Sequence, residues 1–228
     1  MKHITIKAFA IFTLFTVVLS GCKKSLEEKY LNPEASTTAS LPGFLTDLIN
    51  NDRVRPSYWN LRTFLLMHSA GYAQTAFLYP SGSRYQQQDG YTNDYWRDFY
   101  SPGVLGIYRA MEVTYNALPE SEKAAKKIYL EAAKIVLYDQ AAQMVDNFGD
   151  IPFSEAGSLP ATNTIKPAKF DDQAALYDLF IQGLAEANTF FSTATAPADF
   201  SKADILNSGS IDKWRRYANS VRLRLLVR

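Results

Sequence analysis

Apolar residues recur at intervals of three and four positions along most of the chain, the spacing that places them on one face of an α-helix. The clearest case is residues 119–150, where these residues share a face: Ala133, Leu137, Ala141, Met144 and Phe148. Pro119 suits the first turn of such a helix, and Gly149 suits the position just after its end. The pattern therefore predicts a long helix between these two residues.

The same spacing predicts helices before this segment. A short helix is expected near residues 46–49, and longer ones over 59–79 and 94–118, the last interrupted at 101–103 by Pro102. The predicted inward stripe of the 59–79 helix consists of Leu61, Leu65, His68, Tyr72 and Thr75, widened by Phe64 and Leu66. Runs of β-type alternation are missing from the sequence, so the predicted fold class is all-α.

Two further helices are predicted after residue 150. Asp171 or Asp172 caps a helix over 171–191, with a stripe of Leu176, Leu179, Phe180, Gly183 and Ala187. Gly183 indicates either a close approach of two helices or a merely tolerated glycine. The last segment, 211–228, has an apolar stripe of Trp214, Tyr217, Ala218, Val221 and Leu225. Its arginines lie mostly off this stripe. Two explanations are open: a basic helix that binds an anionic surface, or an ordinary amphipathic helix whose arginines are solvated.

The N-terminal 21 residues have the pattern of a secretory signal peptide. Lys2 and Lys7 form a positive front, residues 8–19 are almost wholly apolar, and Ser20 and Gly21 are small. The apolar run is shorter than the roughly 20 residues that a membrane-spanning helix needs. Residues 1–21 are therefore expected to be removed as a leader.

The chain has a single cysteine, Cys22, directly after this leader. Residues 19–22, Leu-Ser-Gly-Cys, resemble a bacterial lipobox, in which the sulfur receives a diacylglycerol and the new amino terminus receives a fatty-acyl chain such as palmitate. Each buried methylene contributes about 0.8 kcal/mol to membrane binding, so two or more chains give a stable tether. Cys22 is the predicted lipid-attachment residue, and a chance cysteine after an ordinary signal is the alternative.

Charge excludes one broad class of partner. Without Lys2 and Lys7 the chain has 22 basic and 23 acidic residues, so it lacks the basic excess of a nucleic-acid-binding protein. Residues 22–40 are polar and are predicted to form a lipidated flexible linker ahead of a helical domain at 41–228. In that linker Glu27 and Glu28 resemble the acidic signals that send some lipoproteins to the cell surface, although solvated linker charge explains them equally well.

No set of residues with catalytic or metal-binding spacing is apparent, so we expect neither an enzyme nor a cofactor. His68 is the one histidine outside the leader, and its place on an apolar stripe favours a buried structural role. Binding has better support. Residues 84–100 combine aromatic rings with amide and carboxylate groups, the mixture that covers the apolar faces of a sugar and pairs with its hydroxyls.

The candidate ligand-binding residues come from this segment. Tyr85, Gln87, Gln88 and Tyr91 are the preferred ones, because they are expected to lie outside the following helix. Trp96 is a further candidate, but it stands four residues before Tyr100 at a helix start, where packing in the core is the competing explanation.

Several segments resemble the SusD/RagB-type nutrient-binding lipoproteins of the outer membrane. They are residues 146–156 (DNFGDIPFSEA), 169–187 (KFDDQAALYDLFIQGLAEA), 212–228 (DKWRRYANSVRLRLLVR) and 94–113 (DYWRDFYSPGVLGIYRAMEV). The resemblance implies a tetratricopeptide-like helical repeat scaffold with long irregular loops. It also implies a surface-exposed, lipid-anchored protein that binds oligosaccharide, or peptide, and delivers it to a SusC-like TonB-dependent β-barrel transporter.

Two departures from the family pattern carry expectations of their own. Family members are about twice as long, so residues 41–228 are expected to be incomplete at the C-terminal end, and the isolated chain to fold poorly. A clear 34-residue tetratricopeptide signature is also missing from the sequence. The alternative function is that of a helical scaffold lipoprotein of the envelope that binds no small molecule.

Lipidation can be tested on the protein purified from its native host. Mass spectrometry is expected to show a chain that begins at Cys22 and carries fatty-acyl groups on that residue, because the lipobox follows a complete apolar region. An intact leader, or a Cys22 sulfur without lipid, would contradict both the predicted tether and the location derived from it.

Overall fold

The computed structural model describes residues 39–76, 88–100 and 103–228, apart from the side chains of Met67 and His68. These residues form helices and one isolated antiparallel bridge between Ile151 and Asp171, which confirms the predicted all-α class. Residues Ser40–Arg228 make one compact unit. The predicted leader (1–21), nearly all of the predicted linker (22–40) and Cys22 lie outside the described residues, and the predicted role of His68 concerns a side chain that is not described.

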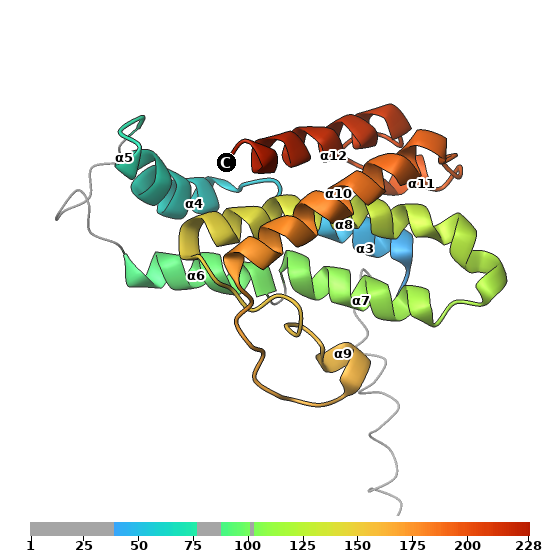
Figure 1. Ribbon diagram of the computed structural model, residues 1–228, viewed down its shortest axis with the longest axis horizontal. Helices are drawn as coiled ribbons and strands as arrows, with labels where there is room; N and C mark the ends of the chain where they lie inside the picture. The colour runs from blue at the N-terminus through green and yellow to red at the C-terminus, as the bar shows by residue number, and fades with distance from the viewer. Residues whose placement is uncertain (1–38, 77–87, 101–102) are drawn as a thin grey trace, which may run out of the picture. The chain divides into compact units, whose positions relative to one another are not determined.

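The helices follow one another in the order labelled in Figure 1. Their bounds are α3 (Leu41–Ile49), α4 (Tyr58–Asn60), the π-helix η1 (Leu61–Ser69), α5 (Ala70–Tyr72), α6 (Asp89–Tyr100), α7 (Val104–Asn116), α8 (Glu120–Phe148), α9 (Leu159–Thr162), α10 (Gln173–Thr193), α11 (Phe200–Ala203) and α12 (Ile211–Leu226).

Helix α8 is the central element, and α3, α6, α7, α10 and α12 all contact it. At 1.5 Å per residue it is about 44 Å long, and it runs through the middle of Figure 1. Adjacent pairs such as Ala132–Ala133 and Val136–Leu137 are buried, so the helix is covered on more than one face. Pro119 precedes its first residue and Gly149 ends it with a φ of 74°, which confirms the predicted bounds.

Helix α10 crosses α8 at very short range, which is the first of the two explanations that the sequence left open for Gly183. A methyl group placed on Gly183 would come within 2.4 Å of Cε2 of Tyr138 on α8, so a larger residue would require the Tyr138 ring to move. The predicted stripe of α10 is buried except at Leu179, which is 43% exposed. Asp172 is the helix cap, since its side chain accepts a hydrogen bond from the Ala175 N–H.

Helix α12 packs along α10 through its predicted apolar stripe. Trp214 is fully buried and stacks on Phe191 of α10, with ring centroids 6.2 Å apart. Two arginines of α12, and Arg228 just beyond its end, pair with aspartates of the same chain: Arg216 with Asp212, Arg224 with Asp139, and Arg228 with Asp146. These pairs favour an ordinary amphipathic helix over a basic surface for anions.

Asp204 organises the turn that leads into α12. Its buried carboxylate accepts hydrogen bonds from the N–H groups of Leu206, Asn207 and Gly209, and from Nε1 of Trp214 at 2.7 Å. Four donors around one carboxylate satisfy a buried charge that would otherwise be strongly destabilising. The carboxylate thereby fixes where Trp214 enters the core.

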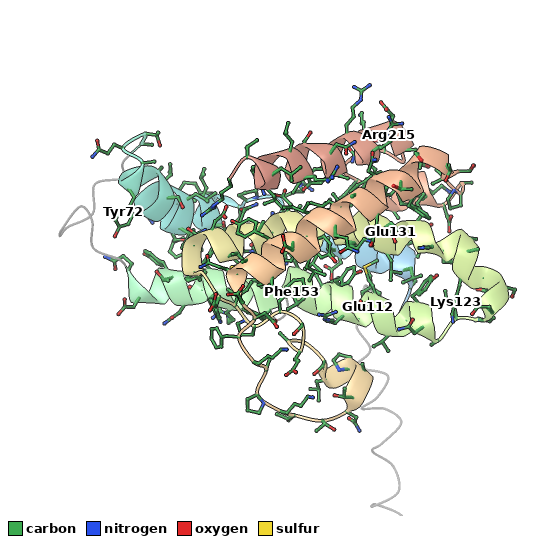
Figure 2. The ribbon with its side chains drawn as sticks, in the orientation of Figure 1. Tyr72, Glu112, Lys123, Glu131, Phe153 and Arg215 are labelled. Carbon is green, nitrogen blue, oxygen red and sulfur yellow. The ribbon has the colours of Figure 1, made fainter. Side chains whose placement is uncertain are left out.

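A second carboxylate fixes the connection between α8 and α10. The side chain of Asp171 accepts hydrogen bonds from the N–H groups of Phe153 and Ser154 and from the Ser154 hydroxyl, at 2.7–3.0 Å. Arg109 of α7 donates to the carbonyl oxygens of Phe153 and Ala156 from the other side. Hydrogen bonds to Asp171 and Arg109 therefore hold the end of the segment 146–156 in place. Within it, Phe153 is buried beside α10 (Figure 2).

The prediction for residues 59–79 is partly wrong. The described part of this segment is helical as far as Tyr72, but Leu61–Ser69 is a π-helix, in which the Ala70 N–H bonds to the Leu65 carbonyl five residues earlier. This wider spacing turns the helix faces away from those that a 3.6-residue period predicts. Phe64 of the predicted stripe is buried, but Leu61 and Tyr72 of the same stripe are exposed, and Thr63, which was not part of it, is buried.

Substituting Gly183 tests the contact between α8 and α10. We expect Gly183→Ala to lower the free energy of unfolding by about 1–3 kcal/mol, because the new methyl group overlaps the Tyr138 ring. The measurement is urea unfolding followed by circular dichroism. Gly90→Ala in α6 is the matched control, since a methyl group there meets nothing within 4 Å. An equal effect of the two substitutions would disprove the close contact.

The role of Asp171 can be tested through pH. Burial acts to raise the pKa of Asp171, but hydrogen bonds from Ser154 and Phe153 outweigh it, so the pKa lies below the ordinary value. Because its folded-state pKa is lowered, the Asp171 carboxylate stabilises the protein fully at pH values above the unfolded-state pKa of about 3.9. This stabilisation is lost as the pH falls through the folded-state pKa.

We therefore expect Asp171→Asn to lower the free energy of unfolding by about 1–3 kcal/mol at pH 7. The difference from the wild-type chain should shrink as the pH falls below about 4. Chemical unfolding at a series of pH values measures it. Asp178→Asn on α10 is the control, because Asp178 is exposed. A difference that is independent of pH would contradict the proposed role of the Asp171 charge.

Candidate functional site

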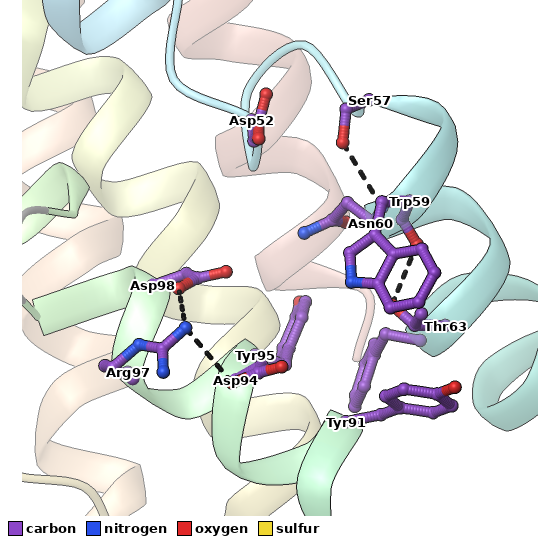
Figure 3. Close-up of a pocket in the computed structure, with 11 residues that line it drawn as sticks. Asp52, Ser57, Trp59, Asn60, Thr63, Tyr91, Asp94, Tyr95, Arg97 and Asp98 are labelled. Atoms are coloured by element: carbon purple, nitrogen blue, oxygen red, sulfur yellow. Dashed lines mark hydrogen bonds and ion pairs between the residues drawn. The ribbon is translucent and has the colours of Figure 1, made fainter.

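A small pocket lies where α6 faces α4 and the start of η1 (Figure 3). Its cavity volume is about 80 Å³. The lining residues are Asp52, Ser57, Trp59, Asn60, Thr63, Phe64, Tyr91, Asp94, Tyr95, Arg97 and Asp98. A single water needs at least about 10–15 Å³ by this measure, so the pocket takes several waters or one polar edge of a larger ligand.

Local hydrogen bonds of α4 place one wall of the pocket. The Ser57 hydroxyl caps the helix by accepting from the Asn60 N–H at 3.3 Å, and the Thr63 hydroxyl donates to the Trp59 carbonyl at 2.8 Å. This arrangement buries Asn60 and Thr63 but leaves 52% of Trp59 exposed. The indole of Trp59 meets the Tyr91 ring of α6 edge-on, with centroids 5.8 Å apart.

The side chains of Phe64, Tyr95 and Arg53 form a stack of three planar groups that supports the pocket. The rings of Phe64 and Tyr95 are parallel, with centroids 3.6 Å apart, and the Arg53 guanidinium lies 3.8 Å from the Tyr95 centroid. The Phe64 ring and the Arg53 guanidinium are both too close to the Tyr95 ring to lie on the same face of it, so Tyr95 lies between them. Arg53 also donates from Nη1 to the Tyr95 carbonyl at 2.7 Å, and its burial lowers its pKa.

Charged groups form the side of the pocket opposite Trp59 and Tyr91 (Figure 3). Nη2 of Arg97 lies 3.0 Å from Oδ1 of Asp94 and 3.4 Å from Oδ1 of Asp98. Asp52 adds a third carboxylate. The pocket therefore combines four aromatic rings with carboxylate, guanidinium, amide and hydroxyl groups, which together can bind a molecule with both apolar faces and hydroxyls.

The structure brings one sequence-predicted binding residue to this pocket. Tyr91 lines it, but from inside α6, because that helix begins at Asp89 and not after the predicted loop. The Gln88 carbonyl accepts from the N–H groups of Tyr91 and Thr92 and so starts the helix early, while Asp89 complements its dipole. Gln88 itself is exposed and does not line the pocket.

The other predicted binding residues lie elsewhere. Trp96 is half-buried and packs edge-on against Phe148 of α8, with centroids 5.0 Å apart, as the core-packing alternative requires. Its ring also faces the exposed ring of Phe170 at 6.4 Å. Tyr85 and Gln87 lie outside the described residues, as does Cys22.

Sequence reasoning missed Trp59, the most exposed ring of the pocket. The periodicity assigned it to the start of a core helix, although it is not one of the stripe residues. Ser57, a helix cap just before two consecutive aromatic residues, was the available signal that these rings stand at a helix start near the surface. Asp94 and Asp98 were within the predicted segment 84–100 but had not been singled out.

A comparison with known protein families shows which family this chain belongs to. Residues 34–228 match the family SusD-like_2, described as "Starch-binding associating with outer membrane". The chain belongs to the SusD-like_2 family. The sequence resemblance noted above is thus confirmed, and the family description associates its members with starch and the outer membrane.

Two solved structures are similar to this SusD-like chain. One is named "chitin-binding protein", with a TM-score of 0.64 and 27% sequence identity over 82% of this chain and 38% of its own. The other, named "Structure of BT1043", has a TM-score of 0.52 and 24% identity over 61% of this chain and 26% of its own, and it supports the fold alone. The chain therefore spans well under half the length of either structure. A search of curated proteins gives no match.

The described residues contain neither a membrane-crossing helix nor a cluster of metal-binding side chains. Within residues 39–76, 88–100 and 103–228, no helix has both the length and the apolar character needed to cross a membrane. The same part of the SusD-like chain has no group of three or more His, Cys, Asp or Glu side chains placed to hold a metal ion.

Proposed function

We propose that this SusD-like protein binds an oligosaccharide at the pocket between Trp59 and Tyr91. The observation that carries the proposal is the pairing of a half-exposed indole with a tyrosine ring beside ion-paired carboxylates. A pyranose ring presents C–H groups that pack on aromatic faces, and hydroxyls that donate to carboxylates or accept from Arg97. The stacked support of Tyr95 limits movement of this wall, which reduces the entropy lost on binding.

The size of the pocket limits how the ligand sits. With about 80 Å³ of cavity volume, it holds part of one sugar unit and leaves the rest of the oligosaccharide on the surface. Such an open site suits a protein that captures and releases its ligand. We propose binding without catalysis, in keeping with a family description that names binding and association.

The proposed setting is the outer membrane, with attachment through lipid on Cys22 and exposure at the cell surface. There the protein would deliver its ligand to a SusC-like TonB-dependent β-barrel transporter. The leader and the lipobox-like residues 19–22 support the lipid anchor, and the family description supports association with the outer membrane. A peptide is the second ligand class. A scaffold lipoprotein without a ligand is the alternative function.

Aromatic substitutions test the binding site. We expect Trp59→Ala and Tyr91→Ala each to weaken oligosaccharide binding by about tenfold, equivalent to about 1.4 kcal/mol, because each removes one face on which a sugar packs. Isothermal titration calorimetry with soluble starch fragments and chito-oligosaccharides measures the affinity. Starch fragments follow from the family description, and chito-oligosaccharides follow from the similarity to a chitin-binding protein.

Tyr58→Ala is the matched control for these variants. Tyr58 is the neighbouring aromatic residue on α4 and is 75% exposed, but it does not line the pocket. Its replacement should leave the affinity unchanged. Binding that is equally strong in all three variants would place the ligand elsewhere, and the failure of every oligosaccharide and peptide to bind the wild-type chain would favour the scaffold function.

A further inference from the structure

Asn60 is a buried polar residue that lines the pocket beside Trp59. It is 9% exposed and ends α4, where its main-chain N–H donates to the Ser57 hydroxyl. Its side-chain amide makes no hydrogen bond with any residue that the structure describes. Figure 3 shows this amide directed from α4 toward the side of the pocket where Asp98 lies. Asn60 therefore offers two donors and an acceptor to an occupant of the pocket.

The other buried polar residue of the pocket lining has an internal partner. Thr63 is 7% exposed, and its hydroxyl donates to the Trp59 carbonyl at 2.8 Å. A buried polar group without such a partner destabilises a fold. Native proteins therefore satisfy nearly all of these groups, and the exceptions are expected at functional sites. The unpartnered amide of Asn60 is an exception of this kind, because it lines a cavity.

We propose that Asn60 determines which ligands the pocket accepts, because its amide binds the hydroxyl edge of the sugar unit that enters. This inference rests on the proposed function and names the group that selects the ligand. A sugar hydroxyl both donates and accepts, so adjacent hydroxyls can satisfy the N–H groups and the oxygen of the amide. The C–H face of the same sugar unit packs on Trp59 and Tyr91.

The size of the cavity fits this exchange of partners. A volume of about 80 Å³ has room for several waters. In the free protein such waters can bond to the Asn60 amide, and a sugar hydroxyl replaces a water with the same donor and acceptor. An apolar group in that place would leave the amide without a partner. A site built for hydroxyls rejects an analogue that lacks them for this reason.

Charge limits the ligand to a neutral oligosaccharide. Arg97 is the one positive group that lines the cavity in the described part of the chain, and it is already paired with Asp94 and Asp98. Arg53 and Arg62 contact rings of the aromatic wall but do not line the cavity. A sugar carboxylate beside Asn60 would therefore face two carboxylates whose positive partner is shared, and like charges would oppose its entry.

The first test is the stability of the free protein. We expect Asn60→Leu to leave the midpoint of urea unfolding unchanged or to raise it, because the amide makes no hydrogen bond within the described fold. Thr63→Val is the comparison and should lower the midpoint, since it removes the hydroxyl that bonds to the Trp59 carbonyl. Circular dichroism follows both transitions. A fall for Asn60→Leu as large as that for Thr63→Val would assign Asn60 a structural role and overturn the proposal.

The second test is binding, measured by isothermal titration calorimetry with maltoheptaose and chitohexaose. For whichever of these binds the wild-type chain, Asn60→Leu and Asn60→Ala should each weaken binding by at least about tenfold. Alanine is smaller than asparagine, so its effect cannot come from blocking the cavity. Asn93→Ala is the matched control and should leave the affinity unchanged, because Asn93 is exposed on α6 and does not line the pocket.

An acidic oligosaccharide tests the selection by charge. An oligogalacturonide of the same length should bind at least about tenfold more weakly than the neutral oligosaccharide, and equal affinity would contradict the proposal.

The outcomes separate this inference from the proposed function. If Trp59→Ala weakens binding but the Asn60 variants bind like the wild-type chain, the pocket remains the binding site and the role of Asn60 is refuted. If neither neutral oligosaccharide binds the wild-type chain, both proposals fail.

Discussion

The structure depends on the burial of α8. A helix that is covered on several faces must be surrounded by others at close range, and α8 contacts α3, α6, α7, α10 and α12. This requirement explains Gly183, which lets α10 approach the Tyr138 ring. It also explains Asp139, the one carboxylate of α8 that receives both the Tyr217 hydroxyl and the Arg224 guanidinium from α12. Small residues and satisfied polar groups are what allow such a helix to be enclosed.

Two carboxylates extend this order to the irregular segments. Asp171 and Asp204 each accept hydrogen bonds from main-chain N–H groups of a turn, and Asp204 also accepts one from Trp214 of α12. Two of the segments that resemble the SusD family, 146–156 and 212–228, are held in this way. Much of the family pattern in this chain is thus explained by folding, because buried turns need their polar groups satisfied. The proposed ligand pocket is lined by residues outside these two segments.

The pocket combines firm support with incomplete cover. The Phe64–Tyr95–Arg53 stack fixes an aromatic wall, but Trp59 remains half exposed. This combination favours recognition because little order has to be created on binding.

The sequence by itself determined the all-α class, the bounds of α8 and the inward stripe of α12, and it narrowed the cap of α10 to Asp171 or Asp172, because these follow from local spacing and capping chemistry. It also placed Tyr91 within the segment that is predicted to bind a ligand. Tertiary structure alone decided that Trp59 joins Tyr91, that Trp96 packs on Phe148, and that Leu61 and Tyr72 face outwards. These outcomes depend on the π-helix and on contacts between residues far apart in the chain, such as Phe64 with Tyr95, which periodicity within one helix cannot specify.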